Sequence, residues 1–517
     1  MFNKKIIISI LLTTFFILNL QAQDIASGVK LIRNEKYNGA KKYFSSLINS
    51  PLKAEAYFYL GEIAFIQQKV DSAKIFYNKG IETNNEFPLN YAGLVRLNVL
   101  DGNGAEAEKN QNQAIELGNE KNPKVYIVLS EAYSWIKNYD KALQILTDAL
   151  NNKLYSPDIY IAIGKLYINK INGTEAVKNF IEALNIDKTN PEALTQKAKV
   201  YSLINNYDAA ISLLNEAISD DPSYSPAYNE LAEVYANTKD YSKASEFYAK
   251  YIEASEITLE KQKRYASILY INKEYDKAIH ILTDVIKVEP ENPFAVRILA
   301  YSYLKLENID DSKSYFQRLF ELSSVDYLPS DYENYADLLT KTGNDSLAIE
   351  YLYKIVELDS TRKDVYGDIS VLCFKNKKWD GVISALLKKG DLKAQEYFDL
   401  GKAYYFKQDY VNADSAFSKL ISKAPSLAIG YFWQARVKTN FDPESEQGLA
   451  KPFYEQFINV SNEDTIRFKK ELIETYSYLG YYYYIKEDKS SSKANWLKVE
   501  AIDPENPQAI AALKELK

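Results

Sequence analysis

Residues 207–210 read YDAA, residues 241–244 read YSKA and residues 275–278 read YDKA. The alanine that ends each segment belongs to a ladder with a step of 34 residues, and an aromatic residue stands three places before most of its members. The members of the ladder are Ala142, Ala176, Ala210, Ala244, Ala278 and, as another small residue at the next step, Ser312. A period of 34 is typical of a helix–turn–helix unit that cannot bury its own apolar face and stacks on copies of itself. The sequence therefore predicts an all-α array of helix pairs.

The composition agrees with a large, folded, helical protein. The 517 residues exceed what a single core usually holds, and the 18 glycines and 15 prolines are few enough to suit helices. Tyrosine is unusually frequent, with 44 copies, and its ring can fill a seam between helices while its hydroxyl reaches water. The formal charge of −7 disfavours nucleic acid and anionic membranes as partners. One cysteine and one histidine can form neither an internal disulfide nor a zinc site of the usual composition, so we expect no metal and no cofactor.

Residues 1–22 have the layout of a secretory signal peptide. Lys4 and Lys5 form a positive end, an apolar run extends from Ile6 to Leu20, and Ala22 offers a small residue for cleavage. The run is shorter than the ~20 residues that a membrane-spanning helix needs. We therefore predict a cleaved leader, no membrane span after cleavage, and a protein that works in the periplasm, at the outer envelope or outside the cell. The ending LQAQ resembles the signal peptides of Bacteroidota-type bacteria.

Each unit of the ladder carries a recurring internal pattern of large and small residues. In residues 394–425 the pattern consists of Tyr397, Leu400, Gly401, Tyr404, Ala413, Phe417 and Pro425. In residues 157–191 it consists of Tyr160, Ile163, Gly164, Tyr167, Ala176, Phe180, Ala183 and Pro191. This pattern resembles that of the tetratricopeptide repeat (TPR) family. Small residues let two helices approach closely, and the bulky ones fill the groove between units.

The resemblance implies a right-handed superhelical solenoid of about 14 repeats. We expect a signal peptide at 1–22, an array of about 12 repeats at 24–427, an irregular expanded repeat with a loop at 428–470, and a final repeat with a capping helix at 471–517. The helices of the array are expected to begin at the prolines Pro123, Pro157, Pro191, Pro293 and Pro329. The spacing also predicts a longer turn around 322–330 and a shortened second helix before Gly390. Residues 252–260 contain neither proline nor glycine, which predicts a helix that runs on.

No residue stands out as catalytic. His280, the only histidine, falls on a second helix, where a surface position is expected, and Cys373 occupies a position that is normally in the core. Gly102 and Gly104 lack the third glycine and the preceding strand of a dinucleotide site and are expected in a turn between helices. We therefore predict that the protein is not an enzyme.

The inner face of the array supplies the candidate binding residues. In the resembled family, a few positions of each first helix point into a concave groove. Carried onto this chain, the groove residues would be Phe58, Phe65, Phe294, Arg297, Tyr301, Phe374, Phe398, Lys402, Tyr405, Tyr481 and Tyr484. Aromatic side chains near arginine or lysine are typical anchors for a bound peptide. The alternative is that these rings pack between neighbouring helices, and the sequence leaves both possibilities open.

The resemblance implies a non-enzymatic scaffold or adaptor of the cell envelope that binds a protein or peptide segment in its concave groove. One alternative is a structural envelope protein that associates with itself through poorly capped ends. A further alternative is a carbohydrate-handling protein with a carboxylate site in the groove. The sequence names neither the partner nor the pathway, and it leaves open whether the protein is a monomer or a homo-oligomer.

Overall fold

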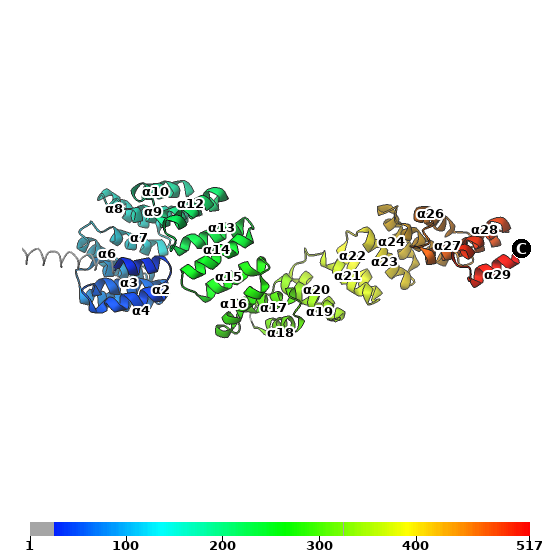
Figure 1. The fold of residues 1–517 in the computed structure, drawn as a ribbon, viewed down its shortest axis with the longest axis horizontal. Coiled ribbons are helices and arrows are strands. Elements are labelled where there is room, and N and C mark those ends of the chain that lie inside the picture. The colour runs from blue at the N-terminus through cyan, green and yellow to red at the C-terminus, as the bar shows by residue number, and fades with distance from the viewer. Residues whose placement is uncertain (1–24, 324, 517) are drawn as a thin grey trace, which may run out of the picture. The chain divides into compact units, whose positions relative to one another are not determined.

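The computed structural model describes residues 25–323 and 325–516, and the predicted signal peptide lies outside them. Helices joined by short turns form this part of the chain, and no strand occurs among these residues (Figure 1). The helices alternate between a first and a second member of a pair, and the last helix stands alone. The predicted fold class, an all-α repeat solenoid, is confirmed.

The helix bounds repeat with the period of the ladder. The first helices are 25–33, α3 (Lys53–Ile66), α5 (Pro88–Leu100), α7 (Pro123–Trp135), α9 (Pro157–Asn169), α11 (Pro191–Leu203), α13 (Ser225–Asn237), α15 (Leu259–Ile271), α17 (Pro293–Lys305), α19 (Pro329–Lys341), α21 (Val365–Lys375), α23 (Ala394–Phe406), α25 (Ala428–Phe441), α27 (Lys469–Ile485) and the final α29 (Pro507–Glu515). The second helices are α2 (Tyr37–Ser46, continued by the 3₁₀ turn Leu47–Asn49), α4 (Val70–Thr83), α6 (Gly104–Leu117), α8 (Tyr139–Asn151), α10 (Gly173–Ile186), α12 (Tyr207–Asp220), α14 (Tyr241–Ala254), α16 (Tyr275–Val288), α18 (Ile309–Glu321), α20 (Asp345–Leu358), α22 (Trp379–Lys389), α24 (Tyr410–Lys423), α26 (Lys451–Ser461) and α28 (Lys489–Ile502).

Local chemistry explains where these helices begin. The five prolines singled out from the sequence stand at the first position of their helices, where a missing N–H costs no hydrogen bond. Many second helices are capped by an Asn or Asp that accepts a hydrogen bond from a backbone N–H of the first turn, as Asn138, Asn206 and Asp409 do. Each repeat therefore encodes its own helix starts.

The turn inside each regular repeat contains one residue in the left-handed region, two places before the second helix. Among the described residues, glycine occupies this position at Gly102 and Gly343. Elsewhere the equivalent residues are Glu35, Gln68, Lys137, Ile171, Asn205, Lys239, Lys273, Glu307, Lys377, Gln408 and Glu487. A side chain in this conformation carries a modest strain, which the packing of the two helices offsets. These turn positions could not be recognised from the sequence, because most of them carry a residue other than glycine.

The predicted seams between helices are confirmed. All alanines of the ladder are fully buried, and so is Ser312. In several repeats an aromatic ring of the second helix lies against a glycine of the first, where a Cβ atom would collide with the ring, as for Phe417 against Gly401 and Trp496 against Gly480. Small residues are therefore required for the approach of the two helices.

Replacing Ala210 by leucine is expected to destabilise the array by about 1–3 kcal/mol, because the seam has no room for three further carbons. Ala210 is fully buried in a cluster with Ala198, Leu214 and Leu231. Thermal unfolding followed by circular dichroism measures the effect, with the exposed residue Leu203→Ala as the control. An unchanged midpoint for Ala210→Leu would show that this alanine does not sit in a helix–helix seam.

The departures from regular spacing have mixed outcomes. The longer turn is present between α18 and α19, and α22 ends before Gly390, which has a φ of +86°. The predicted run-on helix over 252–260 is wrong. The chain leaves α14 at Ser255 with an extended backbone, and the hydroxyl of Thr258 accepts a hydrogen bond from the N–H of Lys261 to cap α15. Capping side chains, which need neither proline nor glycine, separate these two helices.

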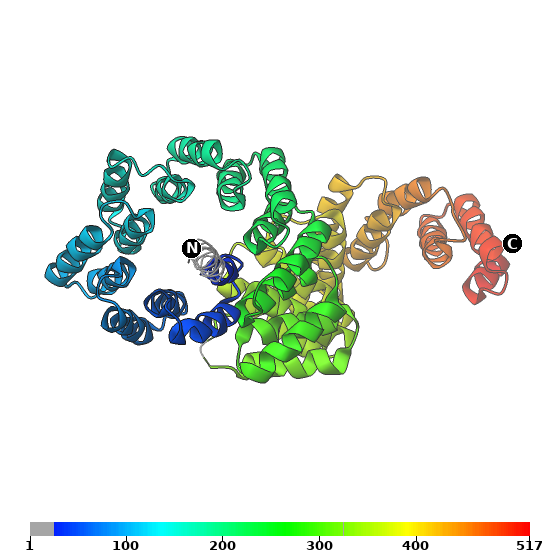
Figure 2. The same cartoon turned by 60° about the vertical axis from the view of Figure 1, so that its left-hand side comes forward.

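The array divides into two compact units, residues 1–306 and 307–517. Unit 1 curves so strongly that its first repeat meets its later ones. Figure 2 shows the first helices in blue next to the green helices near α13 and α15. We call this contact the clasp, and it joins the turn 34–38 to residues 221–225 and 251–261. Residues far apart in sequence thus come together inside one unit.

Glu35 is the centre of the clasp. Its carboxylate accepts a hydrogen bond from the Tyr251 hydroxyl at 2.5 Å and forms an ion pair with the Lys261 ammonium at 2.8 Å. The buried Ser225 hydroxyl donates to the carbonyl oxygen of Asn34 at 2.9 Å. Around this centre lie exposed pairs, among them Lys30–Asp221 and Arg33–Asp158. Such exposed pairs contribute little each, so the half-buried Glu35 contacts hold the clasp.

Replacing Glu35 by alanine is expected to open the clasp locally. The substitution removes two charge-assisted bonds, together worth about 1.5–3 kcal/mol, while the helix pairs of unit 1 keep their seams. Hydrogen–deuterium exchange should become faster in 34–38 and 251–261 and stay unchanged in α5 and α7. Lys109→Ala, which breaks an exposed ion pair within α6, is the matched control. Unchanged exchange in 251–261 would contradict a closed unit 1.

Candidate functional site

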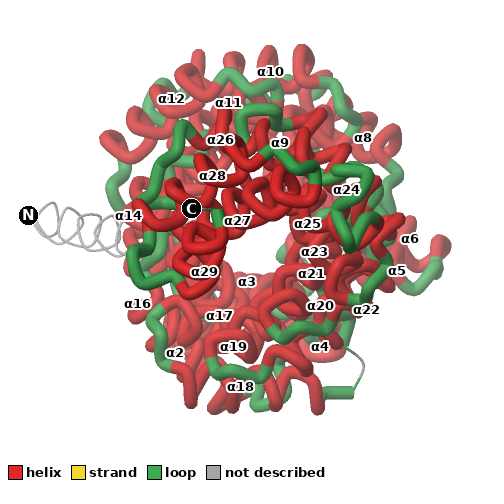
Figure 3. Tube along the Cα trace, turned by 90° about the vertical axis from the view of Figure 1, so that its right-hand side faces the viewer, coloured by secondary structure: helices red, strands yellow, loops and turns green. Residues whose placement is uncertain are grey.

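The inner face of the array is formed by the first helices, which carry all the candidate groove residues. Successive first helices contact one another, for example α21 with α23 and α23 with α25. Within unit 2, Figure 3 shows α21, α23 and α25 on one side of their repeats and α22 and α24 on the other. Side chains on their inward side can therefore meet from one repeat to the next.

Three of the predicted groove residues lie in the core, so their assignment to an open groove is wrong. Phe58 is fully buried against Tyr77, with ring centroids 6.2 Å apart. Phe65 is buried under Arg96, and Tyr301 is only 6% exposed on α17. These rings pack between neighbouring helices, which is the alternative that the sequence leaves open.

The other candidates of α17 and α27 do not form one surface. Phe294 and Arg297 are half-buried on α17 in unit 1. Tyr481 and Tyr484 are 43% and 42% exposed on α27 in unit 2, and the Tyr484 hydroxyl donates to Glu515 of α29 at 2.8 Å. They are accessible, but no ring-to-ring contact joins either of these two tyrosines to the other described residues.

The remaining four candidates come together in unit 2. The Lys402 ammonium lies 5.1 Å from the ring centre of Phe374, 5.3 Å from that of Phe398 and 5.1 Å from that of Trp433. Tyr405, one turn further along α23, packs edge-on against Trp433 with centroids 5.3 Å apart. Lys402 therefore sits in an aromatic enclosure built from α21, α23 and α25.

Arg436 adds a second cation on α25. Its guanidinium carbon lies 4.8 Å from the ring centre of Trp433 and 5.6 Å from that of Tyr405, and its Nε atom pairs with Glu474 of α27 at 3.0 Å. We call the set Phe374, Phe398, Lys402, Tyr405, Trp433 and Arg436 the cation–aromatic patch. Trp433 and Arg436 were not among the predicted groove residues, because α25 lies in the irregular repeat, where the repeat positions are hard to assign. Their spacing of three residues on one helix, next to the aromatic-rich α23, could have identified them.

Burial and charge perturb the titratable groups of the patch. Desolvation lowers the pKa of Lys402; Asp399 raises it again, and the positive charge of Arg436 lowers it further. Desolvation also raises the pKa of Asp399 and that of Glu474, although their cationic neighbours work in the opposite direction. Perturbed pKa values are frequent at binding sites, because half-buried charges there can bind a ligand in place of water.

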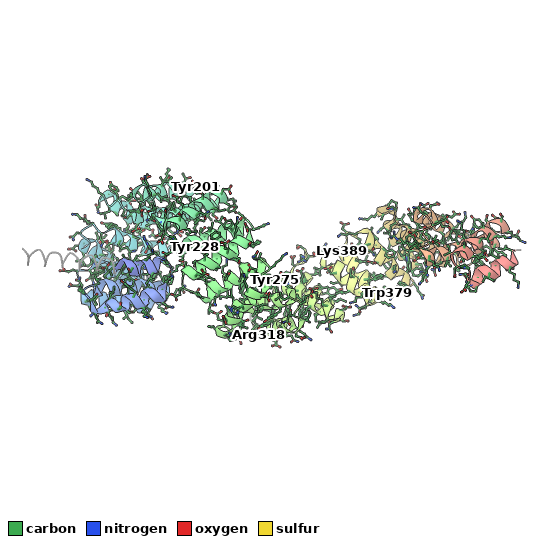
Figure 4. The ribbon with its side chains drawn as sticks, viewed as in Figure 1. Tyr201, Tyr228, Tyr275, Arg318, Trp379 and Lys389 are labelled. Carbon is green, nitrogen blue, oxygen red and sulfur yellow. The ribbon has the colours of Figure 1, made fainter. Side chains whose placement is uncertain are left out.

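The patch rests on a rigid base. Trp433 is 8% exposed and stacks on the fully buried Phe417, with centroids 6.1 Å apart and planes at 22°. On the side toward α22, Trp379 (Figure 4) stacks on Phe406 at 4.8 Å. Phe374 in turn meets Trp379 edge-on at 5.4 Å. The core of unit 2 thus fixes the rings that surround Lys402.

Unit 1 contains a partly open cavity of about 430 Å³, whose lining includes Arg33, Lys165 and Glu192. Its wall carries both signs of charge, but most of them are already neutralised within the protein. Glu192 pairs with Lys165, and Arg33 pairs with Asp158. Burial would raise the pKa of Glu192, yet Lys165 and Arg33 hold it below its ordinary value. The cavity therefore offers less unsatisfied charge to a ligand than the patch in unit 2 does.

The described residues contain no cluster of side chains suited to a metal ion. His280 is exposed and Cys373 is 3% exposed, as predicted for both, and burial raises the pKa of the Cys373 thiol. Gly102 lies in the turn between α5 and α6, as predicted, but the same prediction for Gly104 is wrong, because Gly104 is the first residue of α6. Among the described helices, none is both long and apolar enough to cross a membrane.

Family models match several stretches of the chain. The model "Tetratricopeptide repeat protein 21 N-terminal ARM repeat" matches residues 105–245, and models of the tetratricopeptide repeat match residues 26–85, 332–362 and 397–426. Among curated proteins, the BBSome complex member BBS4 homolog of Drosophila melanogaster is 25% identical over 160 residues. That match covers 30% of this chain and 32% of the relative, so the chain spans about a third of the relative's length.

Solved structures of similar arrays are also found. The C-terminal part of a TPR repeat-containing protein from Cytophaga hutchinsonii is 34% identical, and the match covers 48% of this chain and 99% of that one, with a TM-score of 0.40. YrrB, a TPR protein with an unusual peptide-binding site, is 21% identical, and its match covers 34% of this chain and 91% of that one, with a TM-score of 0.25. The family matches show tetratricopeptide repeats at residues 26–85, 332–362 and 397–426, and the repeated helix pairs continue through the other described residues.

Proposed function

We propose that the protein is a non-enzymatic scaffold of the cell envelope that binds a protein segment on the inner face of unit 2. The observation that carries this proposal is the cation–aromatic patch, in which two half-buried cations and several rings remain open to a ligand on one rigid face. Aromatic residues and arginine dominate the energetics of protein interfaces, and repeat solenoids use their concave faces for binding. The scaffold role of this repeat class supports the non-enzymatic part of the proposal.

Export is the second part of the proposal, and it is supported by the sequence of residues 1–22. A positive end, an apolar run and a small residue at the expected cleavage point are typical of a secreted precursor. Cell fractionation with N-terminal sequencing tests it. A chain that begins at Gln23 in the envelope or external fraction would support export, and a full-length chain in the cytoplasm would contradict it.

Site-specific photocrosslinking tests the binding face. A photoreactive amino acid replaces Tyr405, which is half-buried in the patch, and in the control it replaces Val411, which is 71% exposed on the second helix α24. In envelope extract from the source cells, we expect a defined protein adduct from position 405 that is absent at position 411 and is lost when Arg436→Glu is added.

Three outcomes are distinguishable. An adduct of the expected kind supports a scaffold that binds another protein. An adduct that contains a second copy of this chain would instead support the structural, self-associating alternative. Equal labelling at positions 405 and 411, insensitive to Arg436→Glu, would contradict a binding site on the inner face of unit 2.

A further inference from the structure

The geometry of the patch indicates what the partner presents, on the assumption that the proposed function holds. We propose that the bound segment carries an aspartate or glutamate side chain whose carboxylate binds between Lys402 and Arg436, with apolar side chains on both sides of it. The partner is thus an internal acidic segment of a protein, neither a free C-terminus nor a phosphorylated peptide.

The contacts of the Lys402 ammonium favour an acidic partner. It faces three rings, and among the described residues no hydrogen-bond acceptor or carboxylate lies within bonding distance of it. Lys402 is half-buried, so water can still reach its three donors in the free protein. Ring faces attract a cation but do not accept its hydrogen bonds as an oxygen does. A ligand carboxylate would replace this water with a charged acceptor.

The charges around Trp433 also favour an acidic partner. Lys402 and Arg436 both lie against Trp433, at 5.1 Å and 4.8 Å from its ring centre. Their positive charges repel each other. Asp399 and Glu474 are the acidic groups nearby, and Glu474 is already paired with Arg436. Asp399 accepts a hydrogen bond from Gln395 at 3.0 Å, and Glu474 binds Arg436 Nε and the Tyr454 hydroxyl. One further negative charge would therefore be stabilised by both cations.

The rings beside the two cations favour an internal segment. Phe374 and Phe398 lie near the Lys402 ammonium, and the Tyr405 ring centre lies 5.6 Å from the Arg436 guanidinium carbon. Half-buried rings are therefore available beside each of the two cations. A segment that runs through can place an apolar side chain on each flank, whereas a chain terminus would leave one flank unused. A doubly charged phosphate would bring more charge into an aromatic surrounding than the two cations balance, one of them already being paired with Glu474.

The experiment uses a library of short random peptides with acetylated and amidated ends, displayed on an array and probed with the chain from Gln23 onward. A parallel set carries free C-termini, and another carries phosphoserine. The expected result is enrichment of an Asp or Glu between aromatic or aliphatic residues in the capped set. The best peptide is then measured in solution by fluorescence anisotropy.

Lys402→Met removes the charge but keeps most of the aliphatic stem, so the aromatic enclosure stays filled. We expect it to weaken binding of the best peptide by about tenfold or more, and to weaken binding of the Asp→Asn or Glu→Gln peptide much less. Lys419→Met, on the exposed side of α24, is the matched control and should leave binding unchanged.

The outcomes separate this inference from the proposed function. Peptides that bind the patch, as shown by loss with Arg436→Glu, but carry no acidic residue would overturn the inference and leave the scaffold intact. Preference for free C-termini or for phosphoserine over capped acidic peptides would overturn it too. Peptide binding that is insensitive to every substitution in the patch would overturn both proposals.

Discussion

Replacing Arg96 by methionine is expected to lower the stability of unit 1 by about 3–5 kcal/mol, the usual cost of removing one partner from a buried ion pair. Arg96 lies on α5 with only 2% of its surface exposed, inside an arrangement that spans three repeats. Its guanidinium binds Glu62 of α3 at 3.0 Å and Glu131 of α7 at 2.8 Å, and it covers the Phe65 ring at 4.7 Å.

The cost arises mainly at Glu62. Its carboxylate is 12% exposed and would keep only the hydrogen bond from the Tyr77 hydroxyl, which measures 2.7 Å. An unbalanced negative charge would then remain among apolar groups. Glu131 is 49% exposed and can turn to water, so it contributes less to the penalty.

Urea unfolding and hydrogen exchange in α3, α5 and α7 measure the effect. The double variant Arg96→Met with Glu62→Gln is the matched control, because it removes both charges, and it should recover a large part of the lost stability. If Glu62→Gln gave no recovery in the Arg96→Met background, the loss would reflect packing of the arginine stem and not its charge.

Replacing Phe417 by alanine is expected to lower the stability of unit 2 by a similar amount, about 3–5 kcal/mol, because a fully buried ring leaves a cavity that its neighbours cannot fill. Phe417 lies against Gly401 of the first helix in its own repeat and stacks on Trp433 of the next repeat. It therefore joins two repeats as well as two helices.

The same substitution should impair binding, because Trp433 is the ring shared by Lys402 and Arg436. Differential scanning calorimetry gives the stability of unit 2, and anisotropy with the acidic peptide gives the affinity. Val411→Ala, at a side chain that is 71% exposed on α24, is the control and should cost much less. Normal affinity in a destabilised Phe417→Ala chain would show that the patch does not depend on its base.

The fold could be predicted from the sequence because it repeats. The alanines from Ala142 to Ala278 each lie where two helices approach closely. Glycine–aromatic pairs such as Gly164 with Phe180 mark the same kind of contact. Because this pattern is local and recurs along the chain, the fold can be predicted without knowing the contacts between residues far apart in sequence. Helix starts at proline were predictable for the same reason.

The clasp could not be predicted, because it depends on curvature summed over several repeats. The Glu35–Lys261 ion pair joins residues more than two hundred positions apart, and neither residue differs in type from ordinary surface charges. The exposure of the rings on the first helices also depends on contacts between helices. Phe58, Phe65 and Tyr301 are buried in unit 1, while Lys402 and Tyr405 in unit 2 are only half-buried.

The most direct test of the account is hydrogen–deuterium exchange of the chain from Gln23, alone and saturated with the protein partner that crosslinks at position 405. If the inner face of unit 2 binds the partner, we expect slower exchange on binding in α21, α23 and α25. Exchange in α22, α24 and the clasp should change little. Protection confined to the second helices, or to unit 1, would contradict the central claim that the inner face of unit 2 is the binding surface.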